Sequence, residues 1–368
     1  MVKVTHLTSV HSRYDTRIFL KECSSLAKKY QVSLIVADGK RDEVKNGVAI
    51  YDVGKAKGRL NRIFQTTKKI LKKAIALDSD IYHLHDPELI PIGLKLKKMG
   101  KKVIFDAHED LPKQILTKPY LSPILLRRLS KIIAKYEAWS CSKFDYIVTS
   151  TPIIRDKFLQ FNPHTLDIKN FPILEELTSE SIKWDEKKNE ICYIGGITQS
   201  RGIKEIVQAL GYIEKDIKLN LAGNFIERDI EKEVKGYKEW SKVKEYGFVD
   251  RQKIVQILRD SKVGLVTLHP LISYQESLPI KMFEYMAVGI PVVASNFSLW
   301  QEIIDKENCG ICVNPLDREE IAKSIEYLLS NPKEAKEMGK RGRDAVLQKY
   351  NWRVEEKKLY KIYEDLLR

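Results

Sequence analysis

The chain has 368 residues, 43% of them hydrophobic, which is enough for the cores of two ordinary domains. It has no run close to 18 uninterrupted apolar residues, so the sequence excludes a helix that spans a bilayer. The net charge of +14 belongs to one half of the chain: residues 1–170 carry 32 Lys and Arg against 17 Asp and Glu, whereas residues 171–368 carry 32 against 33.

A basic half of this kind is typical of proteins that meet nucleic acid, an anionic membrane surface or an acidic substrate. The sequence has no recognition-helix, zinc-finger or RNP-type pattern, so we expect no nucleic-acid partner. The N-terminus runs directly into a strand pattern rather than a secretory signal, and the cysteines number five. Both observations favour a cytoplasmic protein with reduced thiols.

Strand and helix patterns alternate along the whole chain. Short apolar runs predict strands at 2–7, 31–37, 48–53, 81–85, 102–106 and 146–150, and again at 191–194, 218–222, 243–246, 263–268, 291–294 and 310–313. Two long helical patterns, 332–349 and 352–367, close the chain. The alternation predicts an α/β protein with parallel, doubly wound sheets.

The restart of the pattern predicts two Rossmann-like domains that face each other across a cleft. We assign the first to residues 1–170, a polar and acidic linker to 171–189, and the second to 190–350. The terminal segment 351–368 is expected to be a helix that packs toward the first domain. Ligands of such sheets bind beyond the carboxyl ends of the strands, so candidate residues are sought in the loops there.

Two segments of the basic half, 59–75 and 121–136, have apolar residues on one helical face and Lys or Arg around it. The apolar faces could pack on a sheet, as those of ordinary amphipathic helices do. The basic flanks favour a reversible contact with anionic lipid, at about 1 kcal/mol per charge near the surface. We therefore expect a peripheral protein on the inner face of the cell membrane.

Three loops of the first domain carry polar candidates. Asp15 and Arg17 lie in the loop before the first helix, His85 and Asp86 end the strand 81–85, and His108 follows the strand 102–106. A lone histidine at a strand end is ordinarily structural. Asp78-Ser79-Asp80 spells a D-x-D metal motif but precedes a strand, so the residues 78–80 are interpreted as a solvated turn and no metal site is predicted.

The second domain offers a strand followed by a glycine loop and a helix start. Gly195 and Gly196 would let the backbone approach a phosphate, and the guanidinium of Arg201 fits phosphate oxygens. Tight strand-to-helix turns need glycine for other reasons, so the loop alone is weak evidence. Phe248 follows another strand end, where it could contact a ligand or pack in the core.

Residues 274–295 predict a loop, a short helix, a turn and a strand. Glu276 lies in the loop before the helix, and Glu284 lies about two turns along it, on the face opposite the apolar one. In this position Glu276 could be a capping group, and Lys281 with Glu284 could form an ordinary surface ion pair.

The spacing of Glu276 and Glu284, with Pro279 three residues after the first acid and an Ala-x-Gly-x-Pro-Val-Val-Ala exit, resembles the signature of glycosyltransferase family 4. This large retaining family has the GT-B fold. The resemblance implies that Glu276 holds hydroxyls of the donor sugar and that Glu284 accepts hydrogen bonds from the ribose. The helix start between them, with Ser277 and Leu278, would face the diphosphate.

The resemblance also implies that His108 stands near the reacting sugar and that the loop of Phe248 lies near the nucleobase. His85 and Asp86 end the preceding strand in a similar way, so we expect them to orient the cleft or the acceptor. The sequence departs from the family at two loops. Family members usually carry Arg at Gly196 and Lys at Arg201, so Lys281 is our candidate substitute for the missing cation. The first loop resembles a variant with Asp-x-Arg before the first helix, and Asp15 and Arg17 are our candidates in it for the group that meets phosphate or acceptor.

These features predict a retaining, metal-independent glycosyltransferase with no cofactor. Its donor would be a nucleoside diphosphate sugar that supplies a hexose or N-acetylhexosamine, and its acceptor a lipid-linked or nascent polysaccharide glycan. Two alternatives remain: a non-catalytic sugar-nucleotide-binding subunit of a membrane transferase complex, and a GT-B sugar-nucleotide epimerase. The residues do not distinguish UDP from GDP, nor do they name the sugar, the acceptor or the oligomeric state.

Overall fold

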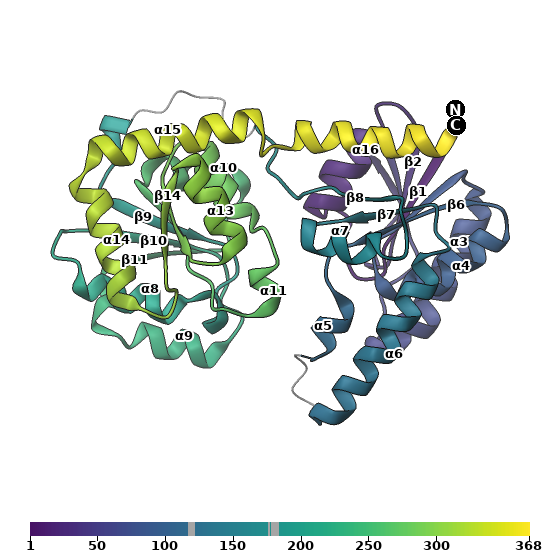
Figure 1. Cartoon of the computed structure of the whole chain (residues 1–368), viewed down its shortest axis with the longest axis horizontal. Helices are drawn as coiled ribbons and strands as arrows, with labels where there is room; N and C mark the ends of the chain where they lie inside the picture. The colour runs from purple at the N-terminus through teal and green to yellow at the C-terminus, as the bar shows by residue number, and fades with distance from the viewer. Residues whose placement is uncertain (117–121, 176, 178–183) are drawn as a thin grey trace. The chain divides into compact units, whose positions relative to one another are not determined.

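The computed structural model describes residues 1–116, 122–175, 177 and 184–368, which form two compact units (Figure 1). Unit 1 comprises Met1–Asn170 together with Arg353–Arg368, and unit 2 comprises Phe171–Trp352. Among the described residues, no helix is long and apolar enough to cross a membrane.

Unit 1 is built on an eight-stranded sheet with the order β3-β4-β2-β1-β5-β6-β7-β8. Neighbouring strands are parallel except for the antiparallel pair β3 and β4 at one edge. The central strands are buried along almost their whole length, which explains why most of their residues are apolar. The polar exceptions, among them His6 and His83, are buried as well. The strands are β1 (Lys3–Leu7), β2 (Gln31–Val36), β3 (Glu43–Lys45), β4 (Val48–Asp52), β5 (Ile81–Leu84), β6 (Lys102–Ala107), β7 (Tyr146–Thr149) and β8 (Thr165–Asp167).

Helical segments connect these strands. The first is a π-helix, η1 (Thr16–Cys23), which continues into α1 (Ser24–Leu26). The last, α16 (Trp352–Leu367), comes from the end of the chain, and the hydroxyl of its Tyr363 lies 2.9 Å from Nδ1 of His83 on β5. The others are α2 (Arg59–Asn61), η2 (Arg62–Thr66), α3 (Thr67–Leu77), η3 (Pro87–Leu89), α4 (Ile90–Lys98), α5 (Leu111–Leu116), α6 (Pro123–Cys141) and α7 (Pro152–Leu159).

Unit 2 contains a six-stranded, wholly parallel sheet with the order β11-β10-β9-β12-β13-β14. Its strands are β9 (Glu190–Ile194), β10 (Lys218–Ala222), β11 (Val243–Gly247), β12 (Val263–Val266), β13 (Val292–Ser295) and β14 (Gly310–Val313). Its helical segments are η4 (Trp184–Glu186), η5 (Gln199–Arg201), α8 (Ile203–Ala209), η6 (Leu210–Tyr212), α9 (Arg228–Lys235), η7 (Lys238–Lys242), α10 (Arg251–Asp260), α11 (Ile272–Gln275), α12 (Ile280–Ala287), α13 (Ser298–Glu307), α14 (Arg318–Ser330) and α15 (Pro332–Gln348).

The predicted fold class is confirmed, and each predicted strand is present with ends that differ by at most two residues. The three-residue strands β3 and β8 were not predicted. The segment 171–189 was predicted to be a polar and acidic linker. Four of its apolar residues are nevertheless buried in the core of unit 2: Phe171, Leu174, Leu177 and Trp184. Residues 121, 176 and 178–183 of the predicted segments lie outside the described residues.

Candidate functional site

The glycine loop of unit 2 follows β9 and is shaped by close backbone contacts. Gly195 has a φ of +123°, a conformation that favours glycine. Gly202, with a φ of +77°, precedes α8, and a Cβ atom there would lie 2.1 Å from the carbonyl oxygen of Thr267. These two glycines are therefore required by the path of the backbone, whether or not a ligand binds.

Gly196 is explained by its neighbours. Nη1 of Arg201 donates a hydrogen bond to the Gly196 carbonyl oxygen at 3.2 Å. A Cβ atom at Gly196 would lie 3.0 Å from the same Nη1 and 3.2 Å from Cδ1 of Ile226. The side-chain ends of Arg201 and Ile226 thus lie close to Gly196, and a side chain there would have to displace them.

Lys281 lies in the first turn of α12, beside the same loop. A Cβ atom at Gly195 would lie 3.2 Å from Nζ of Lys281, and that Nζ stands 3.8 Å from the centre of the Tyr193 ring. The ammonium is buried and has no hydrogen-bond partner. Burial, and then the positive charge of Arg201, lower the pKa of Lys281 to about 7. The loop therefore presents two cations side by side, one of them unpartnered.

The loop between α11 and α12 is held by its own contacts. Glu276 ends α11 and is half-buried. Oγ of Ser277 donates to the Tyr274 carbonyl oxygen at 3.0 Å, and the Ser277 carbonyl oxygen accepts from Nε1 of Trp300 at 2.6 Å. Leu278 packs against the core of the unit. The side chains of Ser277 and Leu278 thus fix the loop, which leaves the backbone N–H groups at the start of α12 as the groups that can face an anion.

Glu284 corrects the expectation of a surface pair. Its side chain is buried rather than turned to solvent, and Oε1 lies 2.6 Å from Nη1 of Arg251 at the start of α10. Lys281 makes no hydrogen bond to it. Glu284 is paired with a residue from another helix, which spacing within one helix does not reveal.

Phe248 follows β11 and leaves 82% of its surface exposed. The alternative that Phe248 packs in the core is therefore wrong. An exposed aromatic ring beyond the carboxyl end of a strand is available to stack on a planar ligand.

In unit 1, His85, Asp86 and His108 line one pocket of about 300 Å³ together with His11. The rings of His11 and His108 lie 5.5 Å apart, and those of His85 and His108 lie 5.8 Å apart. Nε2 of His108 has no hydrogen-bond partner and stands 3.6 Å from Asp106. Burial lowers the pKa of His108 to about 4, so its imidazole is neutral at physiological pH.

Asp86 helps to hold the loops that form this pocket. Its carboxylate accepts hydrogen bonds from the backbone N–H of Ser9 at 2.5 Å and from Oγ1 of Thr8 at 2.9 Å, and it lies 3.3 Å from Nε2 of His11. Burial opposes the charge on His11, but hydrogen bonds to Asp15 and Asp86 outweigh burial and raise the pKa of His11 to about 10. His11 is thus a cation that links the first loop to the end of β5.

Asp15 and Arg17 act within the fold. Asp15 caps η1, because Oδ1 accepts from the N–H groups of Arg17 and Ile18 at 2.9 and 3.0 Å. The buried guanidinium of Arg17 holds both oxygens of Asp106 at 2.9 Å and donates to the Ile168 carbonyl oxygen at 2.7 Å. The expectation that Arg17 meets phosphate or acceptor directly is therefore not supported by its position.

The structure brings the predicted residues together in two groups. Gly195, Gly196, Arg201 and Lys281 adjoin at the carboxyl edge of the unit 2 sheet, and His85, Asp86 and His108 share the pocket of unit 1. Sequence reasoning missed Arg251, His11 and Asp106 as partners. Only Asp106 carried a signal, because it lies two residues before His108 and therefore on the same side of the extended chain.

Comparison with known proteins gives consistent matches over both units. Residues 175–345 match the family described as Glycosyl transferases group 1, and residues 17–167 match Glycosyltransferase Family 4. An uncharacterized glycosyltransferase of Haemophilus influenzae is 26% identical over 338 residues, 86% of each chain. A phosphatidyl-myo-inositol mannosyltransferase of Mycobacterium leprae is 23% identical over 293 residues, 78% of this chain and 74% of the relative.

Solved structures show the same fold at lower identity. Sucrose-phosphate synthase from Thermosynechococcus elongatus superposes with a TM-score of 0.75 and 17% identity, over 100% of this chain and 99% of the other. The Anabaena protein HepE in complex with UDP gives a TM-score of 0.76 with 14% identity, over 99% and 100%.

Proposed function

The chain belongs to glycosyltransferase family 4, the retaining group 1 glycosyltransferases of the GT-B fold, and from this premise we propose its substrates and the roles of its residues. The donor is a nucleoside diphosphate sugar that carries a hexose or N-acetylhexosamine. The acceptor is a lipid-linked or nascent polysaccharide glycan.

The observation that carries the proposal is the pair of cations at the glycine loop. Arg201 and Lys281 adjoin Gly196 and Gly195, and the buried ammonium of Lys281 has no hydrogen-bond partner. A diphosphate would supply the missing negative charge and would accept from the N–H groups at the start of α12. Lys281 thus takes the place of the arginine that the family usually carries at Gly196.

The other donor contacts follow from the same edge of the sheet. We assign Glu276 to hydroxyls of the sugar and Phe248 to the nucleobase. One oxygen of Glu284 is held by Arg251, and we assign the other to the ribose. Ser277 and Leu278 contribute by holding the loop in shape.

Transfer then depends on charge stabilisation at the leaving group. Arg201, Lys281 and the N–H groups of α12 stabilise the charge that grows on the departing diphosphate, so a divalent ion is not required there. The acceptor hydroxyl attacks the face that the diphosphate leaves, so the anomeric configuration is retained. We place His108, as a neutral imidazole that can hydrogen-bond a sugar hydroxyl, with His85 and Asp86 supporting its pocket.

Unit 1 also carries features suited to a lipid-linked acceptor. Leu60 and Phe64 of the segment 59–75 are 72% and 62% exposed, whereas Ile70 and Ala74 of the same segment are buried in the core. On α6, the exposed apolar residues are Ile124, Leu125, Ile132, Tyr136 and Trp139. The amphipathic pattern therefore serves two purposes: part of each apolar face packs on the unit, and part remains free.

A groove of about 520 Å³ lies among these helices and is lined mainly by apolar side chains, among them Ile63, Leu71, Ile92 and Ile133. Two lysines and two glutamates also line it: Lys68, Lys95, Glu88 and Glu137. The apolar walls fit the acyl or polyprenyl chain of a lipid-linked acceptor. We propose that unit 1 meets the anionic face of the membrane with this groove and the exposed residues of α6.

Turnover by the purified chain tests the proposal. Incubation with UDP-linked and GDP-linked hexoses, in EDTA and with lipid vesicles, should give one nucleoside diphosphate and a glycosylated or hydrolysed product. Binding of a nucleotide sugar without turnover would favour a non-catalytic subunit. Conversion of the donor sugar in the absence of an acceptor, with no nucleotide released, would favour an epimerase.

A further inference from the structure

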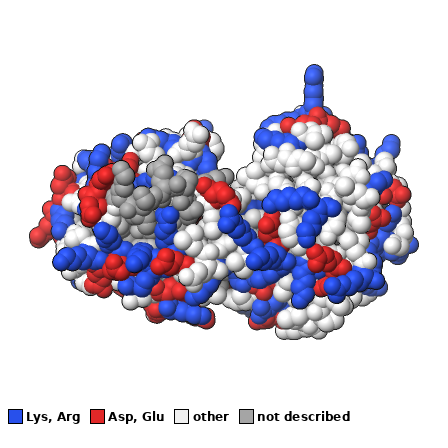
Figure 2. Space-filling model, turned by 90° about the horizontal axis from the view of Figure 1, so that it is seen from above, with Lys and Arg blue, Asp and Glu red and all other residues white. Residues whose placement is uncertain are grey.

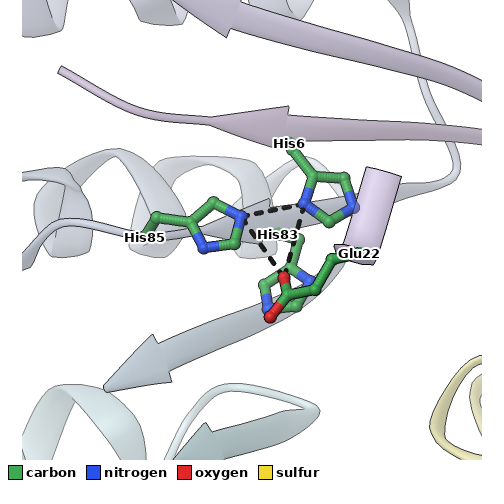
Figure 3. A group of neighbouring side chains, drawn as sticks. All are labelled: His6, Glu22, His83 and His85. Carbon is green, nitrogen blue, oxygen red and sulfur yellow. Dashed lines mark hydrogen bonds and ion pairs between the residues drawn. The ribbon is translucent and has the colours of Figure 1, made fainter. Parts of the chain in front are cut away.

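A second group of chemically active side chains lies in the core of unit 1, away from the cation pair of unit 2. It consists of His6 on β1, His83 on β5, His85 directly after β5, and Glu22 on η1 (Figure 3). All four are buried, and each offers one ligand atom such that these atoms lie within 4.8 Å of one another. The function proposed above makes no use of three of them.

Strand register explains why the histidines meet. His6 and His83 are direct partners across the parallel pair β1 and β5, and His85 lies two residues further along on the same face. Glu22 comes from the π-helix that covers this face. π-Helical turns are rare and often occur at functional sites.

The contacts within the group include one hydrogen bond and leave other polar atoms without one. Nδ1 of His6 lies 2.8 Å from Nε2 of His85, and one of these nitrogens donates to the other. Oε2 of Glu22 lies 4.0 and 3.9 Å from the same two nitrogens. Neither Oε2 nor Nε2 of His83 makes a hydrogen bond. Buried polar atoms are nearly always hydrogen-bonded, so these two atoms beside the histidine pair indicate a place for a cation.

The outward-facing ring nitrogens lie beside polar groups. Nδ1 of His83 and Nε2 of His6 are hydrogen-bonded to the hydroxyl of Tyr363 at 2.9 and 3.3 Å. Nδ1 of His85 faces Oδ2 of Asp106 at 3.3 Å but makes no hydrogen bond. In metal sites a ligating histidine characteristically directs its other nitrogen to a carboxylate or another acceptor, which fixes the tautomer and the ring. His6 and His83 have that second contact here, and His85 faces a carboxylate that could provide it.

We propose that His6, Glu22, His83 and His85 bind one divalent transition-metal ion, with Zn²⁺ as the ion that the donors fit best. Three imidazoles and one carboxylate form a closed four-ligand set, the coordination of a structural zinc site. Zinc–nitrogen bonds of about 2.0–2.1 Å at tetrahedral angles put ligand atoms about 3.3 Å apart. The separations of 2.8, 3.9 and 4.0 Å span that value.

The charge around the group agrees with a cation. Arg17 lies 3.1 Å from Glu22 and also holds Asp106, so two buried carboxylates share one guanidinium. The ion ties η1 to β1 and β5, and through Tyr363 it fixes α16. Its role is structural and separate from the metal-free transfer proposed for unit 2.

Metal content is the direct test. Because the four side chains are buried, the ion enters as the chain folds, and EDTA added to the folded protein removes it slowly. Protein expressed in zinc-supplemented medium and gel-filtered in EDTA should contain about one zinc ion per chain by plasma mass spectrometry. Glu22→Gln and His83→Gln should each lower that content at least fivefold, whereas His164→Gln, at an exposed histidine, should leave it unchanged.

Two further measurements test the proposal even if a variant folds poorly. Wild-type protein grown with Co²⁺ should show the strong visible absorption of a tetrahedral cobalt site. Tyr363→Phe removes only the hydroxyl behind His6 and His83, and should weaken zinc binding about 10- to 100-fold in refolding from zinc-buffered solution. Wild-type protein that is folded and contains no stoichiometric metal after growth in zinc or cobalt overturns the proposal, as does metal retained equally by Glu22→Gln and His83→Gln.

Discussion

Lys281 combines a charge with a buried position, two properties that conflict unless a partner arrives. Its ammonium has no hydrogen bond, and Arg201 adds repulsion, which explains the pKa of about 7. A bound diphosphate removes both penalties at once. Lys281 is therefore suited to pair with a bound diphosphate.

Replacing Lys281 by alanine should raise the Kd for the nucleoside diphosphate and lower kcat about 10²–10³-fold, because one donor to the leaving group is lost. Lys281→Arg should keep most of the activity. Lys333→Ala, at an exposed lysine on α15, is the matched control. Kd by calorimetry and kcat from steady-state assays measure the effects; values for Lys281→Ala equal to those of the control would rule out the assigned role.

The same residue predicts a pH dependence. A bound diphosphate raises the pKa of Lys281 above its free value of about 7, so binding takes up a proton at higher pH. Affinity should be flat below about pH 7 and should fall by up to tenfold per pH unit above it. Calorimetry from pH 6.5 to 9 in buffers of different ionisation enthalpy measures both quantities. Lys281→Arg stays charged and should lose the slope; an equal slope in both proteins would contradict this.

At residue scale, spacing placed residues on elements but did not predict their partners. Helical periodicity placed Lys281 and Glu284 on α12, yet the ion pair suggested between them does not form. Glu284 pairs instead with Arg251 of α10, which is distant in sequence. The pair His6 and His85 is 79 residues apart and depends on strand register, which a single sequence does not supply.

The helices of unit 1 lead to a prediction at element scale. Leu60 and Phe64 expose apolar side chains beside Lys and Arg, a combination that binds anionic bilayers. The double variant Leu60→Asp/Phe64→Asp should lose co-sedimentation with vesicles of phosphatidylglycerol and phosphatidylcholine. Leu347→Asp, at a residue of similar type that is 42% exposed on α15, should not.

Salt and lipid charge provide the controls for that experiment. Binding of the wild type should weaken in high salt and disappear on neutral vesicles, because each basic residue contributes about 1 kcal/mol only near an anionic surface. Unchanged binding of the double variant would mean that these helices do not meet the membrane.

The elements themselves were predictable to different degrees for a physical reason. Strands buried on both faces, such as β12 and β13, appear in the sequence as mainly apolar runs. β3 reads Glu-Val-Lys and β8 reads Thr-Leu-Asp, so neither edge strand contains such a run. The π-helical form of η1 also left no pattern, because its capping by Asp15 resembles that of an ordinary helix.

At the scale of the whole molecule, the uneven charge does not form a simple two-sided surface. Residues 1–170 hold the basic excess, yet on the face in Figure 2 Lys and Arg side chains lie among Asp and Glu side chains in both units. Many of the charges are paired, for example Arg13 with Asp38 and Glu43. The net charge by itself therefore predicted a class of partner, but it did not predict which surface that partner would contact.

The two units should respond separately to their two ligands. The proposed donor contacts, from Gly195 to Glu284, all lie in unit 2, whereas the proposed metal ligands all lie in unit 1. A nucleoside diphosphate at 100 times its Kd stabilises the state that binds it by about 2.7 kcal/mol. Hydrogen exchange with UDP or GDP should therefore slow around the loop after β9 and the start of α12, and stay unchanged in β1 and β5.

Zinc should have the opposite effect on hydrogen exchange. Exchange should be slower in β1, β5, η1 and α16 than in protein expressed without zinc, and it should not change around α12. Exchange followed by mass spectrometry on the four combinations of metal and nucleotide separates the two effects. Protection by nucleotide in β5 but not after β9 would move the donor site to unit 1 and refute the assignment of Arg201 and Lys281.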